Sequence, residues 1–357
     1  MSKAKNGQEG DSVLSRREFF RRLALTSAAL GLGGSSLFSG DKAIGQASDV
    51  PSSTSASAPA EAKSRVVLVR HAQVLGDDNS INGEILQQMV DKALCVLTDK
   101  QERGEAWAQL FKAEDVVSLK VNTIAGPTCS TRPEVAQAMT VGLAEAGIAP
   151  ENIIIWDRTE GELVRAGYKI NFDGSGVRVF SSERVGYGDE IATDAEGRWR
   201  TQFSRIITDH STALINVPIL KTHGETGLTA ALKNHMGSHN RTGAWHSDFS
   251  AIAYLSAAEP VLSRSRLCLC DALRPLYNAG PSDAPRFRWN FCGIVASTDP
   301  VAHDVVCAKI IEDKRKEVRG EAWPISPEPT YLEKAGDLGL GNLDWEKIEF
   351  LEFDLAA

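Results

Sequence analysis

The chain has 357 residues, of which 42% are hydrophobic, 24% charged and 7% aromatic, and its net charge is −8. This composition is typical of a folded protein and excludes wholesale disorder, a collagen-like chain and a coiled-coil rod. An acidic surface repels phosphate backbones, so the charge also argues against general nucleic-acid binding.

The first 47 residues are predicted to be a cleaved export signal. The charged stretch SRREFFRR at 15–22 precedes a moderately apolar stretch and a small-residue region that ends at Gly45–Ala47, which is the layout of a targeting peptide. The motif SRREFF resembles the twin-arginine signal, which is read as an address and not as an anchor. We therefore expect a periplasmic protein, exported by the twin-arginine translocation machinery, with no stable membrane span after cleavage.

Residues 48–64 are rich in Ser, Ala and Pro and are predicted to form a flexible linker. From 65 to 357, short apolar runs alternate with amphipathic stretches. This alternation predicts a single large α/β domain with a mostly parallel open sheet, covered by helices on both faces. An irregular insertion is expected around 183–204. The predicted strands are 66–70, 116–122, 152–157, 177–181, 213–219, 266–272 and 292–297, and the predicted helices are 82–113, 133–147 and 160–167.

Polar residues follow most of the predicted strands, at the edge where an open parallel sheet binds ligands. For any one of them a solvated loop or a helix cap is an ordinary alternative, and Asp299 before Pro300 is a predicted helix N-cap. Because six strands end in this way, we predict that these residues converge on one site. They are Arg70-His71, Lys120 with Asn122, Asp157-Arg158, Lys221-Thr222-His223, Asp271 and Thr298-Asp299.

The densest polar stretch is LKTHGETGLTAALKNHMGSHNRTGAWH at 220–246. A helix is predicted to begin at Thr226-Gly227 and to end at Gly237. Lys221 and His223 precede this helix, and its N-terminal amides favour an anion. Together these groups suit a phosphate or a carboxylate.

Within the same predicted helix, Lys233 and Asn234 flank the apolar face, whereas His235 falls inside it. His235 is therefore either a buried, hydrogen-bonded core histidine or a functional group of the pocket. His235 and His239 are four residues apart, a spacing that suits two metal ligands on one helical face. Gly237 between them breaks the helix, so a metal site that includes His239 and His246 is the weaker hypothesis.

The three lysines Lys120, Lys221 and Lys233 are predicted to converge on one anion. Two of them follow strands of the same sheet, and Lys233 lies on the helix that leaves the second strand. Three ammonium groups that face each other without an anion would repel. The alternative is that Lys233 turns outward to solvent.

The six cysteines have no CxxC pair and no spacing that indicates a zinc or iron–sulfur site. They are Cys95, Cys129, Cys268, Cys270, Cys292 and Cys307. Two interpretations stay open: small buried apolar residues, or a disulfide formed after export to an oxidising compartment.

Several segments resemble the domain-of-unknown-function family 362, in its twin-arginine-exported branch. They are DVVSLKVN (115–122), TRPEV (131–135), IIIWDRTEGEL (153–163), INVPILKTHGETGLTAALKNHMGS (215–238), DALRPLYNAGP (271–281) and STDPVAHD (297–304). The resemblance extends from residue 65 to about residue 311. It supports the fold and the pocket, while the family implies no settled reaction. Some relatives carry a ferredoxin-like domain, and this chain lacks the cluster motifs of that domain.

A second resemblance lies at VVLVRHAQ, residues 66–73, which is similar to the Arg-His signature of histidine phosphatases. In that interpretation His71 would be the nucleophile and Arg70 would hold the phosphate. The chain offers no later strand that ends in the second-histidine segment of that fold, so a phosphohydrolase is the less favoured hypothesis.

We expect an exported enzyme with a strand-end pocket for an anionic substrate or cofactor. Twin-arginine export carries folded proteins that often hold a cofactor, which favours a metal or redox link without naming one. A non-catalytic solute- or cofactor-binding protein is the alternative, and it would use the same pocket. The predicted catalytic residues are His223, His235, Asp157 and Asp271, the predicted binding residues are Lys120, Asn122, Arg132, Lys221, Lys233, Asn234 and Asp299, and the candidate metal ligands are His239 and His246.

Overall fold

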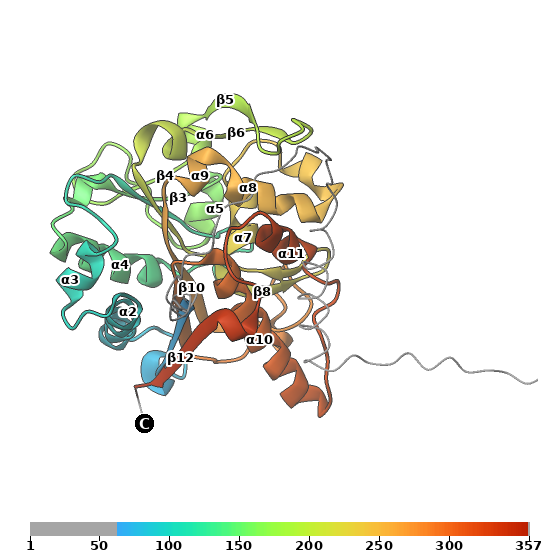
Figure 1. Ribbon diagram of the computed structural model, residues 1–357. Coiled ribbons are helices and arrows are strands. Elements are labelled where there is room, and N and C mark those ends of the chain that lie inside the picture. The colour runs from blue at the N-terminus through green and yellow to red at the C-terminus, as the bar shows by residue number, and fades with distance from the viewer. Residues whose placement is uncertain (1–62, 356–357) are drawn as a thin grey trace, which may run out of the picture. The chain divides into compact units, whose positions relative to one another are not determined.

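The computed structural model describes residues 63–355 (Figure 1). The chain divides into two units, Met1–Ala62 and Lys63–Ala357, and every described residue belongs to the second. The predicted signal peptide and nearly all of the predicted linker therefore lie outside the described residues. Ser64, the last position of that linker, already begins the first strand.

A ten-stranded sheet forms the centre of the described unit. Its order is β12-β1-β11-β10-β7-β2-β3-β4, and β8 pairs with both β10 and β9. Within it, β11 runs antiparallel to β1 and β10, β9 runs antiparallel to β8, and the other pairs are parallel. The mostly parallel sheet is thus confirmed. The strands are β1 (Ser64–Arg70), β2 (Val117–Lys120), β3 (Ile153–Asp157), β4 (Arg178–Ser181), β7 (Ala213–Asn216), β8 (Ile219–His223), β9 (Gly227–Thr229), β10 (Ser265–Leu276), β11 (Gly293–Ser297) and β12 (Ile348–Asp354).

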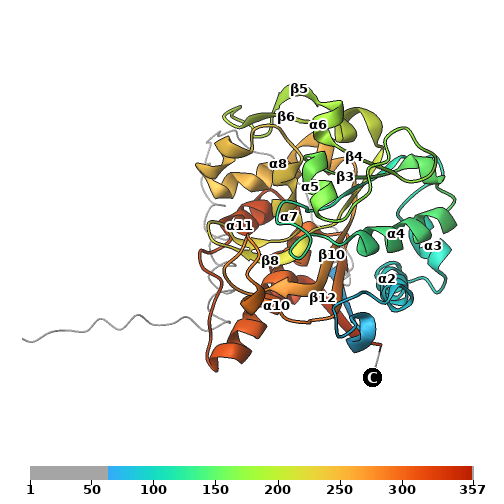
Figure 2. The ribbon, with the colours of Figure 1, turned by 180° about the vertical axis from the view of Figure 1, so that it is seen from behind.

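Helices cover both faces of the sheet, as the two opposite views show (Figures 1 and 2). One face carries α2, α3 and α4, and the other carries α7, α8, α10 and α11. The bounds are α2 (Gly83–Thr98), α3 (Arg103–Ala108), α4 (Pro133–Glu145), α5 (Glu160–Arg165), α6 (Ser182–Val185), α7 (Ala231–Asn234), α8 (Ala253–Ala257), α9 (Glu259–Leu262), α10 (Pro300–Arg319) and α11 (Thr330–Asp337).

The strand sequences explain this two-sided core. Successive side chains of a strand point to opposite faces. On β3, Ile153 and Ile155 belong to the apolar cluster under α2 and α4, whereas Ile154 and Trp156 belong to the cluster on the other face. A strand buried on both sides needs apolar residues at every position, which is why β3 reads as an unbroken apolar run.

Some predicted elements differ in detail. The helical stretch predicted over 82–113 is two helices, because Asp99 adopts a left-handed conformation (φ 56°) and ends α2. The insertion predicted as irregular around 183–204 contains a two-stranded hairpin, β5 (Tyr187–Ala192) and β6 (Arg200–Ser204). Among the described residues, no helix is long and apolar enough to span a membrane.

The helix predicted from Thr226 to Gly237 is wrong in its first half. Residues 227–229 form β9, which pairs with β8, and α7 is a single turn followed by a 3-10 turn over His235–Gly237. Gly227 has a φ of 74°, and a Cβ there would lie 2.1 Å from the carbonyl oxygen of Pro327. A tight glycine turn therefore sends the chain back along β8 before any helix begins.

Candidate anion-binding site

The carboxyl ends of β2, β3 and β8 and the short helix α7 surround a cavity of about 280 Å³. Lys120, Lys221 and Lys233 all line this cavity, and we call it the lysine pocket. The structure thus brings together the three lysines that the sequence placed on one anion. Asn122, Asp157, His223, Asn234 and His246 also line it, so eight predicted site residues share one cavity.

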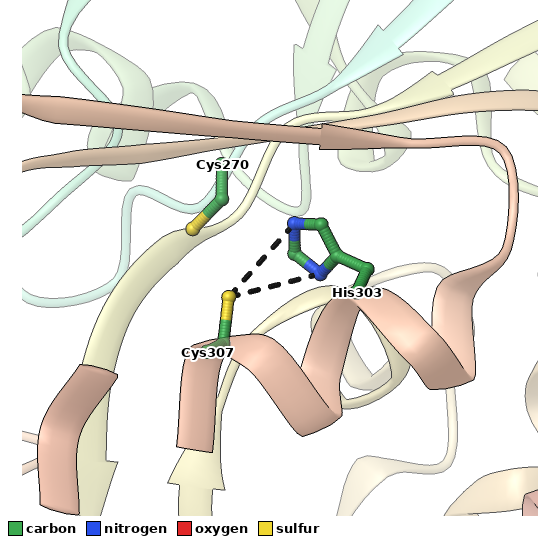
Figure 3. Close-up of side chains that lie close together, drawn as sticks. All are labelled: Cys270, His303 and Cys307. Atoms are coloured by element: carbon green, nitrogen blue, oxygen red, sulfur yellow. Dashed lines mark hydrogen bonds between the residues drawn. The ribbon is translucent and has the colours of Figure 1, made fainter. Parts of the chain in front are cut away.

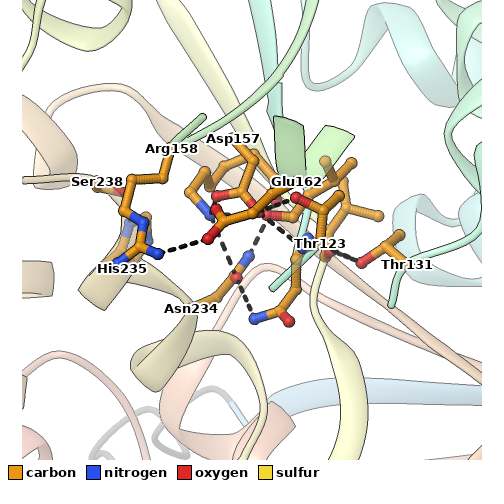
Figure 4. Close-up of polar contacts among 12 residues, drawn as sticks. Thr123, Thr131, Asp157, Arg158, Glu162, Asn234, His235 and Ser238 are labelled. Atoms are coloured by element: carbon orange, nitrogen blue, oxygen red, sulfur yellow. Dashed lines mark hydrogen bonds and ion pairs between the residues drawn. The ribbon is translucent and has the colours of Figure 1, made fainter. Parts of the chain in front are cut away.

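Lys120 and Asp157 form a buried ion pair on the wall of the lysine pocket. Their side chains are 1% and 6% exposed, and Lys120 Nζ lies 2.7 Å from Asp157 Oδ1. The other carboxylate oxygen, Oδ2, accepts hydrogen bonds of 2.7 Å from both the backbone N–H and the hydroxyl of Thr123 (Figure 4). Asp157 is therefore fixed in place and balances the charge of Lys120.

Lys221 forms no ion pair with a carboxylate in the described part of the chain. Its side-chain nitrogen donates to the Asn122 side-chain oxygen at 3.4 Å and to the Cys129 carbonyl oxygen at 3.2 Å, and the residue is 1% exposed. Both acceptors are neutral. Burial lowers the pKa of Lys221 below its ordinary value of 10.5, because a low-polarity surrounding disfavours the charged form.

Lys233 is 8% exposed and lines the pocket, and its side-chain nitrogen forms no hydrogen bond or ion pair with any residue between 63 and 355. Burial lowers its pKa to about 8; Glu225 opposes the shift and Lys221 adds to it. The prediction that Lys233 lines the pocket fits this placement, and the alternative of a solvent-exposed side chain does not. Two buried ammonium groups therefore face one cavity without a described carboxylate partner.

A chain of amides connects the lysines. Asn234 Oδ1 accepts from Asn122 Nδ2 at 3.1 Å and lies 3.5 Å from Lys120 Nζ. The amide nitrogen of Asn234 donates to the Lys120 carbonyl oxygen at 2.9 Å and to Asn216 Oδ1 at 2.8 Å. Asn216 was not among the predicted site residues, although a polar residue that ends an otherwise apolar strand is a signal for such a role.

His223 is oriented by the turn that follows β8. Its Nδ1 accepts hydrogen bonds from the backbone N–H groups of Glu225 and Thr226, at 3.1 and 3.3 Å. The proton of the neutral ring therefore resides on Nε2. Burial is the largest cause that lowers the pKa of His223 to about 3, and the positive charges of Lys233 and Lys221 contribute to the same shift. His223 thus offers the pocket a neutral N–H donor, and its acceptor nitrogen is not available as a base.

His235 lies behind the pocket and does not line it. It is 3% exposed, and its ring nitrogens pair with Asn216 Nδ2 and Ser238 Oγ, each at 3.1 Å. Burial lowers its pKa to about 3, with Lys120 as the next cause. Of the two interpretations that the sequence left open, this geometry fits the core histidine. Its contribution is to hold Asn216, which in turn holds Asn234.

Asp271 and Arg132 pair with each other away from the lysine pocket. Asp271 Oδ2 accepts from the Arg132 backbone N–H at 3.1 Å, and Asp271 Oδ1 accepts from that of Leu273, also at 3.1 Å. The Arg132 guanidinium lies 3.6 Å from the same carboxylate. Neither residue lines the cavity. Asp271 does not end its strand as predicted, because β10 continues to Leu276. Its carboxylate therefore accepts hydrogen bonds from nearby backbone groups.

The predicted convergence is wrong for Asp299. The residue caps α10, where its carboxylate accepts from the N–H groups of Val301 and Ala302 at 2.8 and 2.9 Å, so the predicted N-cap is confirmed. It follows β11, which runs antiparallel to β1 and β10. The carboxyl end of β11 therefore lies at the opposite edge of the sheet from the lysine pocket.

The metal ligands predicted at His239 and His246 are separated by their contacts. His239 is buried against Phe203 and Trp245, and its Nδ1 pairs with Thr201 Oγ1 at 2.8 Å. His246 lies at the rim of the lysine pocket with a 42% exposed side chain. The one group of three close metal-binding side chains among the described residues includes neither.

Arg70 and His71, the residues of the phosphatase hypothesis, do not reach the lysine pocket. The Arg70 guanidinium lies 4.7 Å from the ring centroid of Phe291 and donates to the carbonyl oxygen of that residue at 3.2 Å. His71 Nδ1 accepts the backbone N–H of Gln73 at 3.1 Å. Both residues hold local structure at the end of β1.

Gly237 is a further residue that the sequence analysis did not place in the site. A Cβ at this position would lie 2.9 Å from Lys120 Nζ and 3.0 Å from Asp157 Oδ1. The backbone of the 3-10 turn thus packs directly on the buried ion pair. Any side chain larger than that of glycine would press on the Lys120–Asp157 pair. This packing constrains position 237 more strongly than the predicted helix end does.

Residues 117–309 match the model of the domain of unknown function DUF362, and the chain belongs to this family. The match includes all three lysines of the pocket. No curated protein matches the chain. A solved structure of a Thermotoga maritima protein from the Northeast Structural Genomics Consortium is 13% identical, with a TM-score of 0.39. The match covers 66% of this chain and 59% of that one, so the chain spans less than two thirds of that protein's length.

Proposed function

We propose that this protein is an enzyme that binds a small anionic substrate or cofactor in the lysine pocket. We further propose that it is exported to the periplasm by the twin-arginine pathway, as a member of the exported branch of its family. The support for the first part is the geometry of the pocket, and the support for the second is the SRREFF motif at 15–20.

The main support for anion binding comes from Lys221 and Lys233. Both are buried, and neither forms an ion pair with a carboxylate among residues 63–355. An uncompensated buried charge costs several kcal/mol, and an anion of opposite charge offsets that cost. The cavity of about 280 Å³ is slightly smaller than the usual range of ligand sites, which is about 300–1,000 Å³. A small phosphorylated or carboxylated molecule fits both properties.

The pocket also holds groups that suit catalysis. Lys233, with a pKa of about 8, exchanges a proton readily near neutral pH, which is the property of an effective acid–base group. The Nε2–H of His223 is a neutral donor for an oxygen that gains negative charge. Lys221 would bind the anion, Lys233 would transfer the proton and His223 would stabilise the product charge.

Anion binding is tested by calorimetric titration of the full chain with sulfate, inorganic phosphate and small mono- and dicarboxylates. We expect at least one of these to bind to the wild type and not to Lys221→Met. Lys309→Met is the matched control, because Lys309 lines a different cavity and pairs with Asp313. Equal binding by wild type and Lys221→Met would contradict the proposal that the lysine pocket binds an anion.

A non-catalytic carrier is the alternative, since the same pocket would serve it. Small molecules released from the denatured native protein, identified by mass spectrometry, provide the compound to test. An enzyme converts this compound on incubation, and Lys233→Met binds it without converting it. A carrier returns the compound unchanged whether or not Lys233 is present.

Export is tested separately by replacing both Arg16 and Arg17 with lysine. We expect the precursor to remain in the cytoplasm, because the twin-arginine signal is read through both guanidinium groups. Normal export of the double variant would contradict the twin-arginine assignment and would leave the anion site untouched.

A further inference from the structure

A second polar cluster lies on the face of the sheet covered by α10, apart from the lysine pocket. It consists of Cys270 on β10 and of His303 and Cys307, one turn apart on α10 (Figure 3). All three side chains are completely buried, and their ligand atoms lie within 4.8 Å of one another. This is the one group of three such side chains between residues 63 and 355.

The imidazole of His303 is held in the orientation that metal-binding histidines have. Its Nδ1 lies 2.8 Å from the Asp304 carboxylate, which is itself fully buried. Histidines that bind metals through one ring nitrogen almost always donate the other N–H to such a carboxylate or carbonyl. Nε2 is then the nitrogen left for a ligand, and the Cys307 sulfur lies 3.9 Å from it and 3.8 Å from Nδ1.

The spacing of these donors is compatible with a bound ion. Metal–nitrogen and metal–sulfur bonds of about 2.0–2.3 Å place two donors roughly 3.5–4 Å apart across one ion. The separation of 3.9 Å between Cys307 Sγ and His303 Nε2 is in that range. Cys270 approaches from the sheet, as Figure 3 shows, and its sulfur lies within 4.8 Å of the ligand atoms of the other two residues.

We propose that Cys270, His303 and Cys307 bind a thiophilic metal ion. Two thiolates and an imidazole are ligands that Zn²⁺ and Cu⁺ prefer. Zn²⁺ is favoured here, because its two positive charges are neutralised by the two thiolates. The metal and its ligands then have no net charge, which suits a fully buried site. In this proposal Cys270 and Cys307 are metal ligands, and they are neither plain apolar residues nor a disulfide. The sequence signal for the site is His303-x3-Cys307, because this spacing puts both residues on one helical face.

The ion would stabilise more than its own ligands. Asp304, which orients His303, also accepts the backbone N–H groups of Ala231 and Leu232, at 2.7 and 3.0 Å. These two groups open α7, the turn that carries Lys233 into the lysine pocket. Metal binding therefore links β10, α10 and α7, and it would be completed during folding because the ligands are closed off from solvent.

The test is elemental analysis of the full chain, produced natively and purified under reducing conditions without chelators. We expect stoichiometric zinc, or copper if the ion is Cu⁺, and loss of the metal from both Cys270→Ser and Cys307→Ser. Cys268→Ser is the matched control. Cys268 lies two residues away on the same strand and is also buried, but it is not part of the cluster, so this variant should keep its metal.

A second measurement covers the case in which a cysteine variant does not fold. Wild-type protein stripped of metal and refolded with Co²⁺ should show the sulfur-to-cobalt charge-transfer band in the near ultraviolet and the visible bands of a low-coordinate site. Folded, reduced protein that holds only trace metal and gives no such band would overturn the proposal. A disulfide between Cys270 and Cys307 in the native protein, or loss of metal from Cys268→Ser alone, would overturn it as well.

Discussion

Two cavities of similar size lie beside the sheet, and they differ in how their charges are balanced. The lysine pocket measures about 280 Å³, and a second cavity near β1 and β12 measures about 330 Å³. We call the second one the paired-charge cavity; it is lined by Arg70, Lys309, Asp313, Lys314, Glu317 and Glu352, among others. There Lys309 pairs with Asp313, Lys314 with Glu317 at 2.6 Å, and Arg70 with Glu352 at 3.8 Å.

Of the three lysines of the lysine pocket, only Lys120 forms an ion pair with a carboxylate among residues 63–355, while Arg158 at the edge of the pocket pairs with Glu162. The charges of the paired-charge cavity are also partly exposed, with 33% of the Lys309 side chain and 44% of the Asp313 side chain accessible, so water screens them. Volume alone therefore does not identify the binding site. What distinguishes the lysine pocket is that Lys221 and Lys233 are buried and form no ion pair with a carboxylate among residues 63–355, so a ligand of opposite charge would stabilise them.

The comparison is tested most strongly by removing one acid from each cavity. Asp157→Asn leaves the Lys120 charge buried alone and should lower the free energy of unfolding by about 3–5 kcal/mol. Asp313→Asn breaks a partly exposed pair and should lower it by about 1 kcal/mol or less. Denaturant titration of both variants measures the difference. Equal losses would show that the Lys120–Asp157 pair is solvated and would remove the contrast between the cavities.

Gly237 offers a steric test of the same ion pair. The added Cβ of Gly237→Ala has no room beside Lys120 and Asp157 and should cost about 1–3 kcal/mol of stability, the usual range for overpacking. It should also weaken anion binding, because Lys120 must shift. Gly243→Ala is the control, since nothing lies within 4 Å of the Cβ that it would add. Similar denaturation midpoints for both variants would contradict the close packing.

Lys221→Met separates binding from stability. In the anion-free protein the substitution removes a buried charge that has only neutral acceptors, so the free energy of unfolding should rise by about 1–2 kcal/mol. Lys309→Met, in the paired-charge cavity, should change stability by about 0.5 kcal/mol or less. Denaturation in a buffer free of multivalent anions measures both. A destabilised Lys221→Met would indicate that its hydrogen bonds outweigh the cost of its charge.

The part of the site that could be predicted from sequence follows from strand direction. Lys120, Asp157 and Lys221 end runs of buried apolar residues, and parallel strands bring such ends to one edge. The prediction that Asp299 joins the site is wrong because the residues of a strand do not encode its direction. The strand β11 runs antiparallel to its neighbours β1 and β10.

Other features depend on contacts between distant segments. Gly227–Thr229 fits a helical pattern as well as a strand, and the free edge of β8 decides between them. The Cys270–His303–Cys307 cluster joins a strand to a helix across the domain, so linear cysteine spacing does not reveal it. Gly237 likewise shows its role only once Lys120 and Asp157 are packed against it.

The last prediction concerns the pH dependence of anion binding. Lys233 has a pKa of about 8 in the folded protein, and only its protonated form attracts an anion. Sulfate is a suitable probe because its charge is constant over this range. Its affinity should be constant below pH 8 and should then fall, by about tenfold per pH unit or about 1.4 kcal/mol where Lys233 dominates. Lys233→Met should bind sulfate weakly and lose the step near pH 8, whereas Lys309→Met should keep it. A wild-type affinity that stays constant up to pH 10 would mean that Lys233 does not face the anion, and it would leave Lys221 as the cation that carries the site.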